Sequence, residues 1–497
     1  MRRPVAPGYA SRLRRAALPL VPGLALAGML AGLPAPAVAQ QPLDPWGVMR
    51  PAAPENTLGA SADPAGAACA MAADAQLGTA DQPLTLERAV SLALCTSPRA
   101  RTAWAGLAAQ RAQLGQARAG LLPTVNLAAS RTRDRQETGA APVTTVQTNG
   151  TNLTMNWLLF DFGARRASIT QAEQNLQAAL GSRDAALQDT VAEVAQAWYD
   201  AQTGAGAVAA AAVAEGAADE ILKAAEARVA AGSAIALDAM RARNALAQAK
   251  LATARARGSE RIARGALARV LGLDVRRPLL LSYEGDDGAA PPLSTARTPD
   301  QDLDTLVGQA LATHPALRAA RAQIAAAQAR LEGARAERWP SLSLSYGNYR
   351  NGRPNTALTG SQSSEQIVAL TLSIPLFDGF GRSYRIHEQQ AGLQAREADA
   401  AAAESRIAFE VWRAYQTVEA ETSAVAASAE LVKGTQQAFA AARARHLAGA
   451  IDITDWLLAQ REAAMARQEQ VTALAAWRNA RLRLLASLGT AGFWTVP

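Results

Sequence analysis

Side chains that commonly do chemistry are few in this sequence and lie far apart. The three histidines, His314, His387 and His446, do not have the spacing of metal ligands. The two cysteines, Cys69 and Cys95, form no CxxC pair, and the sequence has no GxGxxG motif and no phosphate-binding loop. We therefore expect a protein that is not an enzyme and that holds no metal and no cofactor.

Aspartate, in contrast, recurs in register. Asp161 is followed by Asp378, and Asp238 by Asp455, at the same difference in residue number. This repeat offset also joins Pro98 to Pro315, Pro123 to Pro340, Gly232 to Gly449, and Leu271-Gly272 to Leu488-Gly489. The agreement predicts a tandem duplication. Its repeats span 84–272 and 301–489, and a linker rich in Pro, Gly and Asp joins them over 273–300.

Each repeat has the same predicted order of elements. In the first repeat a helical stretch over 85–120 ends at Pro123, and two strand-like segments follow. A long helix then runs over 163–231, which is roughly 100 Å at about 1.5 Å per residue. A break at Gly232 starts a last helix. The second repeat begins with a helical stretch over 302–338, and the lengths predict helical rods that carry a two-strand hairpin at one end.

The passage from strand to long helix is written LFDFG in the first repeat and LFDGF in the second. The aspartate of each motif is expected to cap the new helix, and the glycine to give backbone freedom. The expected hinge residues are Asp161, Gly163, Asp378 and Gly379 at this passage, Pro123 and Pro340 before the strands, and Gly232 and Gly449 at the helical turns.

The strand-like segments alternate apolar and polar residues. Val125 and Leu127 alternate with Thr124 and Asn126, and the other three segments repeat this pattern. Such alternation is typical of transmembrane strands with lipid outside and water inside, and also of half-buried strands in a soluble sheet. Aromatic residues near the strand ends favour the membrane. Four strands cannot close a barrel, an eight-stranded dimer would be filled by side chains, and a twelve-stranded trimer would leave a channel.

The ends of the chain show other patterns. Residues 1–39 have an arginine-rich start and an apolar stretch, and the pattern APAVAQ predicts a signal peptide cleaved after Ala39. Residues 40–83, rich in Ala, Pro and Gly, are expected to be weakly structured, and 490–497 form a C-terminal tail. No cysteine follows the predicted cleavage site, so lipid attachment there is not expected.

Charge and cysteine content bound the possible partners. The formal net charge is +7, and the predicted signal peptide carries five arginines and no acid, so the mature balance is near +2. No basic run remains in the mature chain, and nucleic acid is not an expected partner. In an exported protein Cys69 and Cys95 are either bridged or two buried thiols, and both interpretations stay open.

The motifs together resemble the TolC-like outer membrane channels of Gram-negative bacteria. The resemblance covers about 84–489 and rests on the tandem halves, the paired strands, IPLFDGF, the spacings in GSAIALD and GAIDITD, and the terminal Leu-Gly pairs. It implies a mainly α-helical chain that forms a homotrimer, with a twelve-stranded β-barrel in outer membrane lipid and an α-barrel of long hairpins in the periplasm. It further implies a periplasmic adaptor protein and an inner membrane transporter, ABC or other, as partners.

The resemblance also implies a gate at the periplasmic end. Asp455 matches the first gate aspartate of the family and Asp238 its first-repeat counterpart. The second gate aspartate falls on Leu458, and the tyrosine and arginine that tie the closed state fall on His446 and Ile451. A ring of three Asp455 carboxylates would repel one another and favour cations. The alternative is that both aspartates only cap or solvate their helices.

Three functions follow from these observations. The first is passive export in type I secretion of a protein such as a toxin, and the second is multidrug efflux through the same kind of channel. The third, of another class, is a periplasmic coiled-coil scaffold without a pore.

Overall fold

The computed structural model of the chain describes residues 83–137, 139, 143–276, 279–282, 302–350 and 364–489. The chain divides into two units, 1–45 and 46–497, and all described residues belong to the second. The predicted signal peptide, nearly all of the 40–83 segment, most of the linker and the C-terminal tail lie outside the described residues.

The described elements form two copies of one series. The first copy contains α2 (Leu86–Thr96), α3 (Pro98–Ala119), β1 (Thr124–Gln136), β2 (Thr144–Phe160), α4 (Ala164–Ala230) and α5 (Ala236–Val270). The second contains α6 (Leu303–Thr313), α7 (Pro315–Ala336), β3 (Ser341–Arg350), β4 (Ser364–Ser373), α8 (Gly381–Leu447) and α9 (Ile453–Ser487). The predicted fold class, mainly helical with two strands in each repeat, is confirmed.

One prediction about the helices was wrong. The stretches 85–120 and 302–338 are not single helices, because each is broken in front of a proline, at Pro98 and at Pro315. Proline lacks the N–H that a continuous helix needs, and its ring forces the residue before it into an extended conformation. The backbone before each of these prolines is extended, with ψ values of 135° and 126°.

The four strands form one antiparallel sheet in the order β1-β2-β3-β4, so that β2 and β3 join the two repeats. One row across the sheet contains Val125, Met155, Tyr346 and Val368, and the next contains Thr124, Asn156, Ser345 and Ala369. The predicted alternation of apolar and polar residues is seen in these two rows, with Ala369 as the one apolar residue of the second. Val125 and Val368 are 61% and 72% exposed, so the apolar face lacks a cover within one chain.

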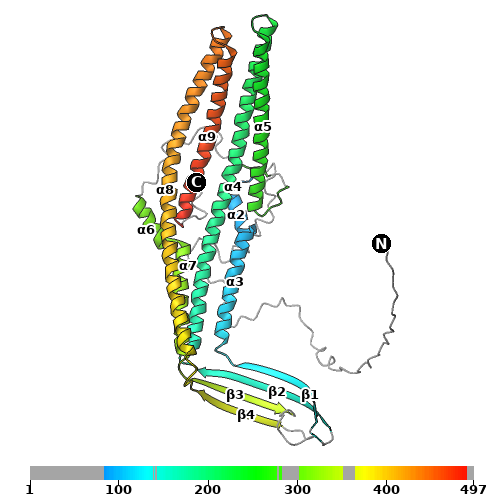
Figure 1. Ribbon diagram of the computed structural model, residues 1–497, viewed down its shortest axis with the longest axis vertical. Coiled ribbons are helices and arrows are strands. Elements are labelled where there is room, and N and C mark those ends of the chain that lie inside the picture. The colour runs from blue at the N-terminus through cyan, green and yellow to red at the C-terminus, as the bar shows by residue number, and fades with distance from the viewer. Residues whose placement is uncertain are drawn as a thin grey trace, which may run out of the picture. The chain divides into compact units, whose positions relative to one another are not determined.

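The long helices carry the remaining contacts. Figure 1 shows the hairpins α4–α5 and α8–α9 side by side, with the sheet at the end of the long helices opposite to the hairpin tips. α4 packs against α3 and α5 of its own repeat and against α7 and α9 of the other. Among the described residues, no helix is both long and apolar enough to cross a membrane.

The breaks at the prolines are capped in two different ways. In the first repeat the hydroxyl oxygen of Ser97 accepts a hydrogen bond from the N–H of Ala100 (3.2 Å). In the second repeat the Nδ1 atom of His314 accepts one from the N–H of Ala316 (3.2 Å). Burial lowers the pKa of His314, because the charged imidazolium loses its hydration.

We predict that acid weakens the folded state through His314. Only the neutral imidazole accepts the N–H, and the folded-state pKa lies below the unfolded value of about 6.5, although Glu410 and Asp189 oppose the shift. The stabilisation is therefore present above about pH 6.5 and is lost as the pH falls through the folded-state pKa. His314→Ser, which copies the first-repeat cap, should remove this pH-dependent part of the stability while keeping a cap.

Thermal unfolding between about pH 7.5 and about pH 5 measures the effect. The wild-type unfolding temperature should fall more steeply than that of His314→Ser. His387→Ser, which alters an exposed histidine, is the matched control and should follow the wild type. Identical slopes for all three proteins would contradict the assignment.

Candidate functional site

The four predicted gate residues all lie near the two hairpin tips. Each long helix ends at a glycine with positive φ, 71° at Gly232 and 76° at Gly449. Beyond Gly232 the N–H of Ser233 donates to the carbonyl of Arg228 (2.9 Å), and the second tip repeats this bond. A helix that ends with this hydrogen bond needs a residue with left-handed backbone angles directly after it, and glycine adopts these angles without strain. This explains why glycine recurs at both tips.

The two equivalent aspartates have different surroundings. α5 begins at Ala236 and α9 at Ile453, so Asp238 and Asp455 both lie in a first turn, where the helix dipole favours a carboxylate. The Asp238 carboxylate lies 3.9 Å from the Arg241 guanidinium, and its side chain is 16% exposed. Asp455 is exposed and has no ion-pair partner among the described residues. One tip therefore offers a free carboxylate and the other a partly covered one.

His446 links the first tip to the second. The residue is only 5% exposed, and Arg228 of α4 donates to its Nε2 atom (3.2 Å) and to its backbone carbonyl (3.0 Å). The Nδ1 atom lies 3.2 Å from the carbonyl of Ile451, and the Trp456 ring lies 5.2 Å from the imidazole. These contacts fit a neutral imidazole that carries its proton on Nδ1. The two positions at which ties of the closed state were expected, 446 and 451, are therefore in contact with each other through this imidazole.

A second link joins the tips through other residues. Arg241 of α5 donates to the hydroxyl of Thr454 in α9 (3.1 Å). Leu458, one helical turn after Thr454, is 54% exposed and belongs to neither link. Sequence reasoning missed Arg228, Arg241 and Thr454 as linking residues. The available signal was the arginine that recurs at the end of both long helices, at 228 and 445.

The strand-to-helix passages are held by matching ion pairs. The carboxylate of Asp161 accepts from the N–H of Arg165 (2.9 Å) and pairs with its guanidinium (3.0 Å). Asp378 does the same with Arg382, at 2.9 Å and 2.8 Å. The side-chain hydrogen bond from Arg382 lowers the pKa of Asp378. Each carboxylate thus accepts an N–H of the first turn of the long helix.

The backbone of these passages is left-handed at two successive residues. The φ angles are 49° and 96° at Phe162 and Gly163, and 68° and 67° at Gly379 and Phe380. Sequence reasoning assigned this freedom to the glycines alone. Because the order of Phe and Gly is exchanged between the repeats, each passage holds one phenylalanine in a conformation that L residues rarely adopt. The Phe162 ring stacks on Trp339 at 5.6 Å, a contact that helps to hold it there.

The two predicted proline hinges lie directly before β1 and β3. α3 ends at Ala119 and α7 ends at Ala336, so both helices stop before Pro123 and Pro340 are reached. The prolines therefore stand between the last helical turn and the first strand residue, rather than at the helix end.

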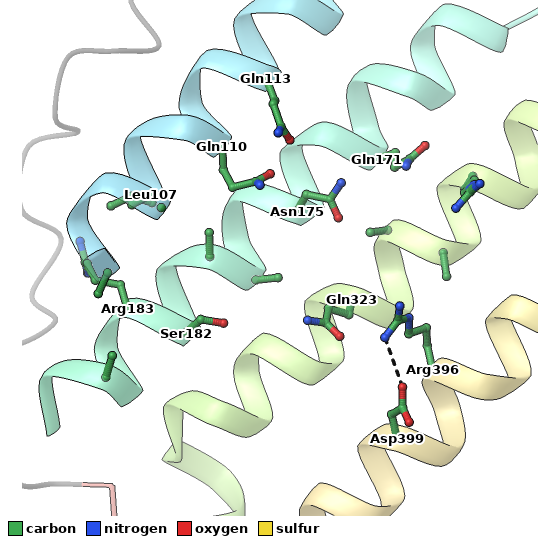
Figure 2. A pocket seen from close by; sticks show the side chains of 18 of the residues that line it. Leu107, Gln110, Gln113, Gln171, Asn175, Ser182, Arg183, Gln323, Arg396 and Asp399 are labelled. Carbon is green, nitrogen blue, oxygen red and sulfur yellow. Dashed lines mark hydrogen bonds and ion pairs between the residues drawn. The ribbon is translucent and has the colours of Figure 1, made fainter. Parts of the chain in front are cut away.

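A polar cavity of about 1010 Å³ lies among α3, α4, α7 and α8. Figure 2 shows many of the side chains that line it. The lining residues with amides or hydroxyls are Thr102, Gln110, Gln113, Gln171, Asn175, Ser182, Gln323 and Gln389. The lining charges drawn there include Arg396 and Asp399, which pair with each other at 3.2 Å. Arg99, Arg183 and Arg330 also line the cavity, so that among its described lining residues four arginines stand against one acid, Asp399. The wall is therefore polar and carries more positive than negative charge.

The two cysteines give a partial answer. Cys95 is disulfide-bonded. Cys69 lies outside the described residues. Among the described residues no group of three or more His, Cys, Asp or Glu side chains is placed to hold a metal ion.

Comparison with known proteins gives three kinds of similarity. The family model described as "Outer membrane efflux protein" matches residues 89–273 and 306–490. Protein CyaE of Bordetella pertussis is 36% identical over 413 residues, which cover 83% of this chain and 85% of that protein.

Solved structures of outer membrane channels have the same fold. The CmeC outer membrane channel of Campylobacter jejuni is 15% identical with a TM-score of 0.69, covering 83% of this chain and 87% of that one. The outer membrane protein VceC of Vibrio cholerae is 20% identical with a TM-score of 0.66, covering 82% and 96%.

We predict that Arg228→Ala frees His446 for chemical modification. In the wild type the imidazole is buried and its Nε2 atom is occupied, so diethylpyrocarbonate should react there slowly. Removing the guanidinium should raise the reaction rate at His446 severalfold, as followed by mass spectrometry of peptides. His387, which is exposed, serves as the internal reference.

Lys223→Ala is the matched control, because it removes a cation from the same helix without touching His446. It should leave the rate at His446 unchanged. Equal rates at His446 in the wild type and in Arg228→Ala would show that the link does not form.

Proposed function

This chain belongs to the outer membrane efflux protein family and is an outer membrane efflux channel that extends into the periplasm, and we propose that it serves type I secretion of a protein as a homotrimer. The observation that carries the proposal is a sheet with two open edges in a chain whose helices line a polar cavity. The similarity to CyaE favours secretion of a protein over multidrug efflux, which stays the second candidate.

The sheet edges support the trimer. β1 and β4 each leave one row of backbone N–H and C=O groups without a strand partner among the described residues. Between the repeats, Thr154 of β2 lies opposite Gly347 of β3. Carried over by the repeat offset, this register places Thr371 of β4 opposite Ser130 of β1 in the next copy. Three copies then close twelve strands, enough to leave a passage.

The polar wall supports an extended polypeptide as cargo. Protein chains vary in charge and hydrogen-bonding groups along their length. A wall of amides and hydroxyls offers such a chain many weak and interchangeable hydrogen bonds, and its arginines would attract the acidic stretches of the chain. In the proposed trimer this wall faces the passage.

The tips support docking of a periplasmic adaptor protein, with an inner membrane transporter beyond it. Ile235, Leu237 and Leu447 are 62%, 47% and 63% exposed at the two tips. Apolar side chains gathered at the end of a polar hairpin fit a protein partner better than water. Energy for transport would come from that transporter, since the chain has no nucleotide-binding motif.

The gate is proposed at Asp455. Its carboxylate is exposed in the first turn of α9, and three copies would bring three such carboxylates to the closed end. Like charges so close would bind cations and keep anions out. Asp238, the Arg228–His446 link and the Arg241–Thr454 link would hold the hairpins in the closed arrangement, with Leu458 filling the second gate position.

We predict that Asp455→Ala leaves assembly intact and raises the leak conductance of the closed channel in planar bilayers severalfold. It should also weaken the block by multivalent cations, because the ring loses its charge. Glu462→Ala, which alters another exposed acid of α9, is the matched control and should behave as wild type. Unchanged conductance and cation block in Asp455→Ala would remove the gate assignment.

The secretion role has its own test in the producing bacterium. Deleting the gene should remove a specific protein from the culture medium and leave drug susceptibility unchanged, and the wild-type gene should restore export. Increased drug susceptibility with an unchanged set of secreted proteins would favour efflux instead. A protein recovered in the soluble periplasmic fraction, without conductance, would favour the scaffold.

A further inference from the structure

The two long helices occupy equivalent places but have different neighbours. α4 packs against helices of both repeats, on α3 and α5 and also on α7 and α9. α8 packs against α6, α7 and α9 of its own repeat, and near the tip Arg443 forms an ion pair with Glu220 of α4 (3.6 Å). The face of α8 that corresponds to the α9-facing side of α4 has no helix of the described residues along it.

The contacts between α4 and α9 are a template for what that face would meet. Gln202 of α4 accepts a hydrogen bond from Arg478 of α9 (3.5 Å), and Gln196 accepts one from Arg483 (3.0 Å). Ala195, next to Gln196, is fully buried. The two hydrogen bonds therefore place this side of α4 against α9.

Adding the repeat offset to the α4 residue of each pair and subtracting it from the α9 residue gives the equivalent contact, between α8 of one chain and α5 of another. At the first pair this contact joins two opposite charges. Gln202 becomes Glu419 on α8, and Arg478 becomes Arg261 on α5. Both are exposed, and neither has an ion-pair partner among the described residues. A neutral amide and an arginine in the template thus correspond to an acid and an arginine, which would attract each other across two chains.

The same offset exchanges large and small side chains. Buried Ala195 becomes Trp412, which is 47% exposed and stacks on Phe409 at 5.8 Å. Leu482, which precedes Arg483 on α9, becomes Gly265 on α5. A Cβ atom at Gly265 would meet nothing within 4 Å. In the template the larger residue is on α9 and the smaller one on α4, whereas at the equivalent positions the larger residue is on α8 and the smaller one on α5, with open space at its Cβ position.

We propose that this bare face of α8 docks on α5 of a second copy of the chain, with Trp412 over Gly265 and Glu419 paired with Arg261. The proposal rests on the proposed channel function for its oligomer, and it adds the side chains that set the register between subunits. It is continuous with the pairing of β4 on β1, because the same offset relates both contacts.

Engineered cysteines test the contact directly. The template joins the far ends of two long side chains, so a short bismaleimide cross-linker is used rather than a direct disulfide. The double variant Glu419→Cys with Arg261→Cys should be cross-linked between chains, giving a ladder of up to three chains on a denaturing gel. Glu421→Cys with Arg261→Cys is the matched control and should give no ladder, because Glu421 lies two residues further along, on the other side of α8. A ladder only in the control, or in neither, would overturn the proposal.

Compensating substitutions give an independent test. Trp412→Ala should lower the temperature at which the oligomer dissociates in detergent, because it leaves a gap over Gly265. Gly265→Leu alone should also lower it, because the added side chain meets Trp412. The double variant rebuilds the Ala195 and Leu482 combination of the template and should recover most of the loss.

A double variant that is no more stable than the two single changes added together would overturn the pairing of Trp412 with Gly265. The conductance of the wild-type protein in planar bilayers distinguishes a failure of this interface from a failure of the proposed channel function. Conductance without cross-linking or recovery would leave the channel standing and reject this interface. Loss of both would reject the channel as well.

Discussion

Backbone hydrogen bonding is the constraint on which the rest of this structure depends. A four-stranded antiparallel sheet leaves one unpaired row of N–H and C=O groups along β1 and another along β4. In lipid each unpaired group costs several kcal/mol, so a sheet of an outer membrane protein has to close on other strands. Because β2 and β3 already join two repeats in one register, the proposed trimer satisfies every edge by using that register again.

The proposed packing of the helices follows the same rule, because the contact of α4 with α9 within the chain has an equivalent contact of α8 with α5 between chains. Where the repeats differ in sequence, the equivalent positions face different neighbours. Arg241 and Thr454 form a polar link within the chain. The residues at the positions equivalent to them in the other repeat are Leu458 and Leu237, which are 54% and 47% exposed. In the proposed trimer the closed end would thus alternate polar links with apolar contacts, and Leu458 would replace a charge by packing.

Much of the fold could be predicted because local signals set it. Glycines with positive φ mark both hairpin tips, and alternation of side chains marks the strands. The helix breaks at Pro98 and Pro315 were missed, although proline carried the signal. The Arg228–His446 link joins residues 218 positions apart, and no local pattern encodes such a contact. The left-handed phenylalanines were also out of reach, because propensity alone favours glycine there.

The central claim is that one chain supplies a third of a closed channel. Its most direct test is native mass spectrometry of the mature protein, released from the outer membrane in mild detergent. The structure and the proposed closure predict a complex of three identical chains. A particle that contains one chain and no partner, under conditions where the protein still conducts ions, would contradict it.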